Sequence, residues 1–224
     1  MPRKARFTVE NGIYHVMARG NEKRKIFHDE DDFGYYLKLL KNNKDEYNLK
    51  IYHYILMINH VHLILKSLTG KLLSEAMKRL NVSYTWYYRK KYAGIGHFFQ
   101  DRFKSFLIQN GKYLLECGRY VETNAVSAGI VEKPEQYKWS SYRVYAYGEA
   151  SKLVDINPEY ENLSSDEDTR KIIYREFVKQ KCFEKSDENR FFKTGAYGSK
   201  EFIEELKNKG LKPAWSHSGQ PKKK

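Results

Sequence analysis

Cysteine, proline and long apolar runs are all scarce in this sequence. Its 224 residues include two cysteines and five prolines. Cys117 and Cys182 stand far apart and match no CxxC pattern, which argues against a disulfide framework or a zinc knuckle and fits a reducing compartment. The longest apolar stretches, such as residues 54–58, have the length of a strand and cannot span a bilayer. Because the basic first residues lead into no apolar segment, we expect a soluble, cytoplasmic protein without a signal peptide or a membrane partner.

Basic and aromatic side chains are abundant instead. The formal net charge is +13 and the sequence pI is about 9.4, and there are 19 tyrosines, 12 phenylalanines and 3 tryptophans. Residues 1–150 contain 25 Lys and Arg against 15 Asp and Glu, whereas residues 151–221 contain 13 of each kind and three lysines follow them. Phosphates bind Lys and Arg, and unpaired bases stack on aromatic rings, so this composition favours a nucleic-acid partner. A basic protein with a tyrosine-rich core would have the same composition.

Hydrophobic periodicity predicts an alternation of strands and helices. Runs of β-branched and aromatic residues indicate strands, and apolar residues that recur at helical spacing indicate helices. In chain order we predict a strand at 13–18, a helix at 29–47, strands at 49–58 and 61–66, a helix at 72–88, a strand at 98–109 and a helix at 112–123. This order predicts an α+β fold, with a largely antiparallel sheet and helices packed on it.

The composition changes after residue 150. Residues 151–165 are polar and are predicted to be a linker, and helices are expected at 166–181 and 200–208. Ser199 is a candidate N-cap of the last helix, and Gly210 stands just past its end. The tail after Leu211 has no periodicity and is expected to be disordered and basic. We therefore predict a main domain at 1–150 and a small C-terminal helical extension at 151–224.

The pattern His60-Val61-His62 is the first candidate for chemistry. Strand side chains alternate between the two faces of a sheet, so both histidines project to the same side and can converge on one divalent cation. The apolar neighbours Leu63 and Leu65 are typical of a buried central strand. The pair predicts a metal site, although two hydrogen-bonded sheet histidines would show the same pattern. His15, in the first strand, can face this strand or pack in the core.

The helix predicted at 112–123 carries the second candidate group. Tyr120 and Asn124 are four residues apart and share a helix face, and Glu116 lies one turn earlier on that face. A phenol and a carboxamide placed in this way offer a nucleophile and an oxygen ligand to one cation. An ordinary amphipathic helix, with a tyrosine at its margin and an asparagine at its end, has the same spacing.

Several ordered motifs together resemble the HUH single-tyrosine transposases, and above all their REP-associated, IS200-like branch. The resemblance covers residues from about 12 to 145. It rests on these segments: YHV at 14–16 with RGN at 19–21, MINHVHL at 57–63, GHFFQDRF at 96–103, RYVETNAVSAG at 119–129 and WSSY at 139–142. The fold that this resemblance implies for the main domain is the HUH, ferredoxin-like sandwich.

The resemblance also implies roles for individual residues. The family's metal-binding histidines correspond to His60 and His62, its nucleophilic tyrosine to Tyr120, and the third metal ligand to Asn124. Glu116 is the alternative to Asn124. The implied cofactor is Mg²⁺ or Mn²⁺, and the implied chemistry is transesterification through a 5′-phosphotyrosine that leaves a free 3′-OH. The implied partner is single-stranded DNA with a hairpin or with inverted-repeat ends, bound by one subunit or by a homodimer.

Two departures from the family pattern concern the backbone. Ile58 and Ala125 stand where the family usually has proline. Neither position supplies a metal ligand, so the departures affect local stiffness and leave the chemical groups in place.

Basic residues near these motifs are candidates for DNA contact. They are Arg19, Arg24, Lys25, Arg89, Lys90, Arg102 and Lys104. Each charge on its own is typical of a solvated surface, but the set lies in the segment with the large basic surplus, which favours phosphate binding.

Three other interpretations stay open from the sequence. The first is a domesticated DNA- or RNA-binding protein that keeps the fold without strand transfer. The second is a metal hydrolase that uses the two histidines with Glu116 and water, and the third is a structural RNA-binding module.

Overall fold

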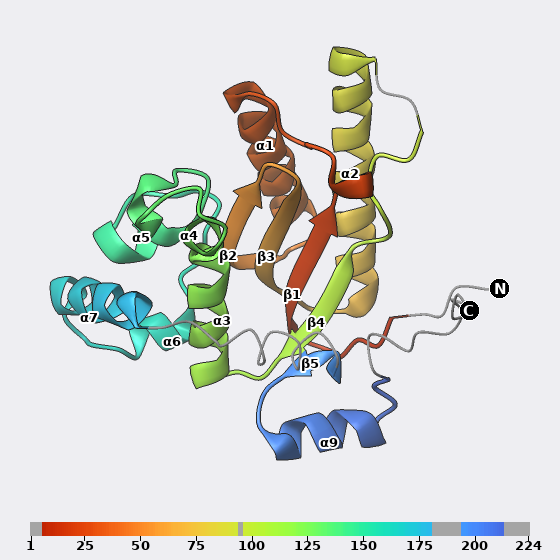
Figure 1. Ribbon diagram of the computed structural model, residues 1–224. Helices are drawn as coiled ribbons and strands as arrows, with labels where there is room; N and C mark the ends of the chain where they lie inside the picture. The colour runs from red at the N-terminus through yellow and green to blue at the C-terminus, as the bar shows by residue number, and fades with distance from the viewer. Residues whose placement is uncertain (1–5, 94–95, 181–193, 213–224) are drawn as a thin grey trace, which may run out of the picture.

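In the described part of the chain, five strands form a sheet in the order β2-β3-β1-β4-β5 (Figure 1). The structure, a computed structural model, describes residues 6–93, 96–180 and 194–212. Cys182 and all but the first residue of the tail after Leu211, which we expect to be disordered, lie outside the described residues. The strands are β1 (Gly12–Arg19), β2 (Lys50–Met57), β3 (His60–Ser67), β4 (Lys104–Ile108) and β5 (Ala196–Tyr197). Neighbouring strands are antiparallel, except that β4 and β5 are parallel. The predicted α+β fold with a largely antiparallel sheet is confirmed.

Helices cover both faces of the sheet, with α1 and α2 on one face and α3 on the other (Figure 1). These three helices are α1 (Glu30–Glu46), α2 (Gly70–Tyr92) and α3 (Lys112–Glu122). The shorter or peripheral helices are α4 (Asn124–Ser127), α5 (Tyr142–Tyr147), α6 (Pro158–Glu161), α7 (Glu167–Lys179) and α9 (Lys200–Asn208), with 3-10 turns η1 (Asn21–Lys23) and η2 (Pro134–Gln136). Within the described residues, no helix has both the length and the apolar composition that a membrane crossing requires.

The alternation of side chains along β3 separates two cores. Val61, Leu63 and Leu65 are buried against α1 and α2, in the larger cluster of apolar side chains. Ile64 is buried in the smaller cluster beneath α3, and His62 points to that same side. The β3 face toward α1 and α2 is therefore apolar from Val61 to Leu65, and the other face places a histidine among apolar residues.

Side-chain caps define the starts of several helices. Thr69 Oγ1 accepts a hydrogen bond from Leu72 N at 3.2 Å at the start of α2. Ser199 Oγ accepts from Phe202 N at 3.2 Å at the start of α9, which confirms the predicted N-cap. Gly210 follows the end of α9 with a φ of 100°, a backbone conformation that glycine adopts without strain.

The predicted strand at 98–109 is wrong in its first half, because β4 begins only at Lys104. Residues 98–103 lie outside β4, and Phe99 forms only an isolated bridge with Gly20, the residue after β1. Phe103 is buried in the core beneath α1 and α2. The apolar side chains of this connection pack into the core as those of a strand would, so the sequence pattern looks like a strand. The backbone, however, does not form the hydrogen bonds of a continuous strand here.

The segment at 151–165 is packed against the sheet, and the prediction of a polar linker is wrong. Leu153 and Tyr160 are buried and belong to the larger core. The Asp155 carboxylate accepts a hydrogen bond from the backbone N–H of Ile51 in β2 at 2.8 Å. The few apolar residues in this polar stretch contact the core. The average composition of the segment hides this, because most of its residues are polar.

Candidate active site

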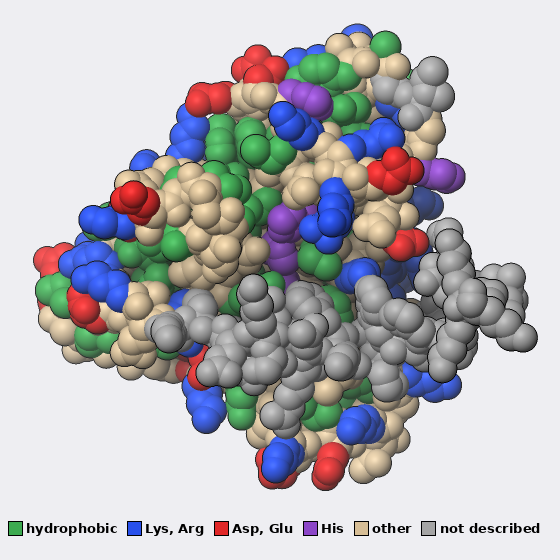
Figure 2. Space-filling model, in the orientation of Figure 1, with side chains coloured by type: hydrophobic (Ala, Val, Ile, Leu, Met, Phe, Trp, Pro, Cys, Tyr) green, Lys and Arg blue, Asp and Glu red, His purple; other side chains and the backbone are tan. Residues whose placement is uncertain are grey.

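Three histidines share the sheet face that α3 covers. His60 and His62 alternate with apolar residues on β3, and their ring centroids lie 4.9 Å apart. His15 projects from β1 to the same side, with its ring centroid 4.9 Å from that of His62. Figure 2 shows histidine atoms at the surface near the middle of this face, with Lys and Arg atoms beside them. The same-side placement inferred for His60 and His62 from strand periodicity agrees with this geometry.

Hydrogen bonds hold the Nδ1 atom of both candidate metal ligands. His60 Nδ1 lies 2.6 Å from Asn59 Oδ1, and His62 Nδ1 lies 2.7 Å from His15 Nε2. Because an amide oxygen only accepts, the proton of neutral His60 resides on Nδ1 and the lone pair on Nε2. The bond between His62 Nδ1 and His15 Nε2 can run in either direction, and it leaves Nε2 of His62 as the acceptor nitrogen when His62 Nδ1 donates. Metal-binding imidazoles are commonly held through their other nitrogen in this way, so the pair fits a divalent cation.

Burial keeps these imidazoles neutral at physiological pH. It lowers the pKa of His60 to about 4, and the positive charge of Arg19 adds to the effect. Burial, followed by the charges of His15, His60 and Arg19, lowers the pKa of His62 well below its usual value. Burial also lowers the pKa of His15 to about 3. Neutral imidazole is the form that binds a cation, so no proton has to leave these histidines before a metal binds.

Tyr120 lies beside the histidines. Its ring centroid is 6.1 Å from that of His62 and 5.9 Å from that of His15, and both contacts are edge-on. The buried residues Cys117 and Val121 press α3 onto the sheet and so bring the half-buried Tyr120 to this position. The phenol that the sequence singles out and the histidine pair are therefore adjacent.

Tyr113, two turns earlier on α3, lies elsewhere. Its ring packs edge-on against that of Tyr197 in β5, with 5.2 Å between centroids. The two half-buried tyrosines of α3 thus have different neighbours, an aromatic ring for Tyr113 and imidazoles for Tyr120.

The two candidates for a third metal ligand are both engaged in the fold. Asn124 Nδ2 donates to the Tyr120 carbonyl oxygen at 3.0 Å, one helical turn back. The Glu116 carboxylate accepts from the Tyr197 hydroxyl at 2.6 Å. Across the described ranges, no three His, Cys, Asp or Glu side chains form a group that could hold a metal. A cation on the histidine pair therefore requires an amide, water or phosphate oxygen to complete its coordination.

Two of the seven basic residues predicted to contact DNA flank the histidines. Arg19 is opposite His60 in the β1–β3 register, and Lys104 is opposite Met17 in the β1–β4 register. Directly opposite residues share a sheet face, so both cationic side chains belong to the histidine side. Positive charge at this place suits a phosphate that approaches the histidines and Tyr120.

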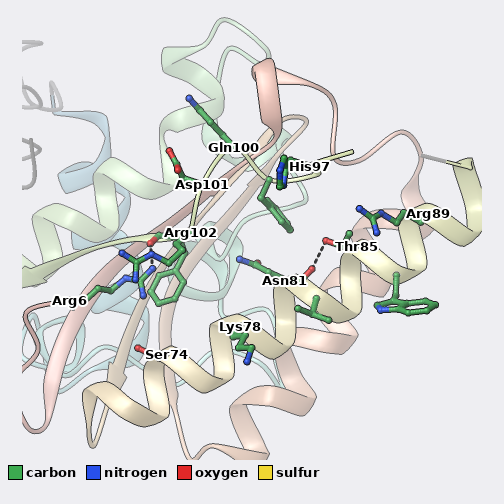
Figure 3. Close-up of a pocket in the computed structure, with 14 residues that line it drawn as sticks. Arg6, Ser74, Lys78, Asn81, Thr85, Arg89, His97, Gln100, Asp101 and Arg102 are labelled. Carbon is green, nitrogen blue, oxygen red and sulfur yellow. Dashed lines mark hydrogen bonds between the residues drawn. The ribbon is translucent and has the colours of Figure 1, made fainter. Parts of the chain in front are cut away.

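The other five basic residues lie on other segments, of which the loop with Arg24 and Lys25 reaches the turn beside His60, because Asn59 Nδ2 donates to the Lys23 carbonyl oxygen at 3.4 Å. Arg89 and Arg102 line a cavity beside α2, in which Figure 3 labels both. Arg24 and Lys25 follow η1 in the loop after β1, and Lys90 is exposed in the last turn of α2. The sequence grouped all seven by their proximity along the chain, but the fold separates them.

Two site residues were missed or left undecided in the sequence. Asn59, which contacts His60, appeared in the sequence only as part of the MINHVHL motif, and His15 had two possible positions. The signal that would have identified His15 is the pairing register of β1 with β3, a long-range feature that no local pattern contains.

Comparisons with known proteins found one family model and two solved structures that we report here. A family model described as "Transposase IS200 like" matches residues 8–124. A solved structure of a REP-associated tyrosine transposase bound to a REP hairpin has a TM-score of 0.56 and 18% sequence identity, covering 70% of this chain and 95% of that one. A candidate transposase from Deinococcus radiodurans has a TM-score of 0.33 and 14% identity, covering 61% of this chain and 96% of its own. None of the curated proteins compared with the chain matches it.

Proposed function

This chain belongs to the IS200-like transposase family, and from that premise we propose that it cuts and rejoins single-stranded DNA by transesterification. Tyr120 is the proposed nucleophile, and His60, His62 and Asn124 are the proposed ligands of Mg²⁺ or Mn²⁺. The observation that carries the proposal is the position of the Tyr120 ring, 6.1 Å from the ring of His62. A phenol beside two neutral imidazoles suits an attack on a phosphate held at the same place.

The proposed reaction exchanges one phosphoester for another. The Tyr120 oxygen bonds to the scissile phosphorus as the bond from phosphorus to the 3′-oxygen breaks, and the phenolic proton leaves to solvent. The departing 3′-oxygen takes up a proton and becomes a free 3′-OH, while the 5′-phosphate stays on Tyr120. A second 3′-OH can reverse the exchange and join a new strand. A bound divalent ion would supply Lewis-acid polarisation of the phosphate in this reaction.

The remaining residues of the site orient and attract the DNA in this proposal. Asn59 and His15 are positioning residues, because each contacts the Nδ1 atom of one histidine and fixes the direction of its ring. Arg19 and Lys104 bring positive charge to the histidine side of the sheet. The REP hairpin in the related solved structure makes a hairpin-bearing single strand the substrate class that we propose.

We assign the chemistry to residues 1–150 and a supporting role to the extension that follows. Support comes from a contact with the helix that carries Tyr120, since the Tyr174 hydroxyl on α7 donates to the buried Glu122 carboxylate on α3 at 2.7 Å. We propose that the extension stabilises α3 through this contact.

The proposal is tested by the covalent intermediate. Incubated with labelled, hairpin-bearing single-stranded DNA and Mg²⁺ or Mn²⁺, the native protein should form a protein–DNA adduct that survives denaturant. Tyr120→Phe should form none, because it removes only the nucleophilic hydroxyl and leaves the ring to pack. Tyr113→Phe is the matched control on the same helix and should still form the adduct. An undiminished adduct with Tyr120→Phe would place the nucleophile elsewhere, and cleavage by the native protein without any adduct would favour a hydrolase.

A further inference from the structure

A cavity separate from the histidines lies between α2 and the connection from α2 to β4 (Figure 3). Its volume is about 740 Å³. One wall is a side of α2 that includes Lys78, Asn81, Trp86 and Arg89, and the other comes from residues 97–103 and from Arg6, near the start of the described chain. We call it the α2 cavity. None of its lining residues belongs to the histidine and tyrosine group.

The α2 cavity has an excess of positive charge. Four Lys or Arg side chains line it, namely Arg6, Lys78, Arg89 and Arg102, against the single carboxylate of Asp101. Such an excess within one concave surface attracts a polyanion and concentrates it there.

Two of these guanidinium groups lie side by side at one end of the cavity (Figure 3). Arg6 is fixed, because its guanidinium stacks 3.6 Å above the Phe103 ring and donates to the Phe103 carbonyl oxygen at 2.7 Å. Burial, and after it the positive charge of Arg102, lowers the pKa of Arg6 to about 10. An anion placed between the two would relieve this repulsion, and phosphate fits guanidinium geometry well.

The α2 cavity also presents an aromatic ring to solvent. Trp86 is 75% exposed, and Val82, one turn earlier, is 49% exposed. Tyr84 and Tyr88 on the same helix are buried in the core, so α2 does not depend on Trp86 for its packing. A large exposed ring beside several cations is the combination that proteins use to stack an unpaired base while its phosphates are bound.

We propose that the α2 cavity binds single-stranded DNA, with an unpaired base stacked on Trp86 and the flanking phosphates on the cavity's Lys and Arg side chains. This inference rests on the proposed function, because it assigns part of the same DNA substrate to a second surface. The cations Lys78 and Arg89 are eleven residues apart on α2, which corresponds to about 16 Å along the helix axis. The site is therefore long enough for several nucleotides.

The α2 cavity is connected to the histidines through the backbone. Gln100, which lines the cavity, donates its N–H to the Arg19 carbonyl oxygen at 2.9 Å, and Arg19 is opposite His60 in the sheet. In the proposed arrangement, a strand that leaves the cavity passes Gln100 and Arg19 on its way to the histidine side of the sheet, the face opposite α2. The cavity would then hold DNA that flanks the scissile phosphate.

The test separates base stacking from phosphate attraction. Affinity is measured in EDTA, where the proposed cleavage cannot occur, by fluorescence anisotropy. The probes are an oligothymidine of about 12 nucleotides, an abasic strand of the same length and a duplex. The native protein should prefer the oligothymidine over the abasic strand by about 5- to 150-fold, the range that one stacked base contributes. Trp86→Ala should lose this preference, and Trp86→Phe should keep part of it.

Matched variants control for surface changes elsewhere. Lys78→Ala should weaken both single strands, because it removes a phosphate contact, whereas Lys71→Ala removes an exposed lysine of the same helix outside the cavity and should change little. Ile172→Ala removes an exposed apolar side chain on α7 and should keep the base preference. Circular dichroism would verify that each variant is folded.

Two results would overturn the inference. One is an unchanged preference for bases in Trp86→Ala, and the other is an equal loss of affinity for single strands and duplex in that variant. Neither result depends on the Tyr120 adduct. An absent adduct with the expected Trp86 result would overturn the proposed catalysis alone, and a normal adduct without a Trp86 effect would overturn the cavity alone.

Discussion

Two histidine clusters lie beneath α3 on the same face of the sheet, and they differ in how their nitrogen atoms are used. The His62 cluster contains His15, His60, His62 and Asn59, with Tyr120 beside it. The His53 cluster contains these buried groups: His53 on β2, Glu122 on α3, Ser141, Asn157 and Tyr174 on α7. Both clusters combine imidazoles with a residue of α3, but only one of them contains a carboxylate.

The His53 cluster is fully satisfied by hydrogen bonds. His53 Nδ1 lies 2.9 Å from Glu122 Oε1, and its Nε2 lies 2.9 Å from Asn157 Nδ2. The remaining capacity of the Glu122 carboxylate is used by the hydroxyls of Ser141 at 2.6 Å and Tyr174 at 2.7 Å. Every polar group in this cluster therefore has its partner within the fold, which is the mark of a structural network.

The His62 cluster leaves imidazole lone pairs for an outside partner. The partners of His60 and His62 at Nδ1 are an amide oxygen and another imidazole, and both rings are held neutral by burial. Among the residues that the structure describes, this cluster contains no carboxylate, and no hydrogen bond is recorded at Nε2 of His60 or His62. A histidine on this sheet face whose nitrogens are hydrogen-bonded to a buried carboxylate and amide stabilises the fold. A histidine without a carboxylate partner keeps a nitrogen that can bind a ligand.

The largest effect on stability is expected from the carboxylate that defines the structural cluster. Glu122→Ala should lower the free energy of unfolding by about 3–5 kcal/mol, because it leaves His53 and two hydroxyls without their buried acceptor. Urea unfolding followed by circular dichroism measures the change. Glu116→Ala is the control on the same helix and should cost less, since the half-buried Glu116 accepts one hydroxyl. A loss below about 1 kcal/mol for Glu122→Ala would mean that the network does not hold α3.

The sequence predicts the local parts of this comparison well. Strand alternation placed His60 and His62 on one side, and helical spacing placed Tyr120 and Asn124 on one face, because both inferences depend on neighbours along the chain. Motif resemblance then linked the two segments.

The sequence does not reveal what depends on distant pairing. Contact between His15 and His62 follows from the β1–β3 register, and Glu122 meets Tyr174 only because the extension folds back on α3. The two-residue strand β5 is too short to give a periodic signal. These contacts join residues far apart in the sequence, and local propensities do not predict which distant residues pair.

An intermediate effect is expected from Gly118, which lets α3 approach the structural cluster closely. A Cβ at this position would lie 2.6 Å from Nε2 and Cε1 of the His53 ring, so Gly118→Ala forces the ring or the helix to move. Overpacking of this kind costs about 1–3 kcal/mol and should outweigh the helix propensity of alanine.

Gly34 in α1 is the matched control for that substitution. A Cβ there would meet nothing within 4 Å, so Gly34→Ala should stabilise the protein by about 0.5–1 kcal/mol. Thermal unfolding of both variants gives the comparison. A stabilising Gly118→Ala would show that α3 can shift freely above His53.

The smallest effect on stability is expected in the cluster that we assign to chemistry. His60→Ala should change the free energy of unfolding by less than about 1 kcal/mol in EDTA, because His60 is only partly buried and contacts Asn59 at its edge.

The native protein and His60→Ala should differ in stability once a metal is added. Mn²⁺ at 100 times its dissociation constant should stabilise the native protein by about 2.7 kcal/mol and His60→Ala by far less, since a ligand stabilises only the state that binds it. His97→Ala, which removes an exposed imidazole outside the cluster, should respond to Mn²⁺ like the native protein. Equal stabilisation of His60→Ala by Mn²⁺ would mean that the cation binds elsewhere. The His62 cluster would then not be the metal site that distinguishes it from the His53 cluster.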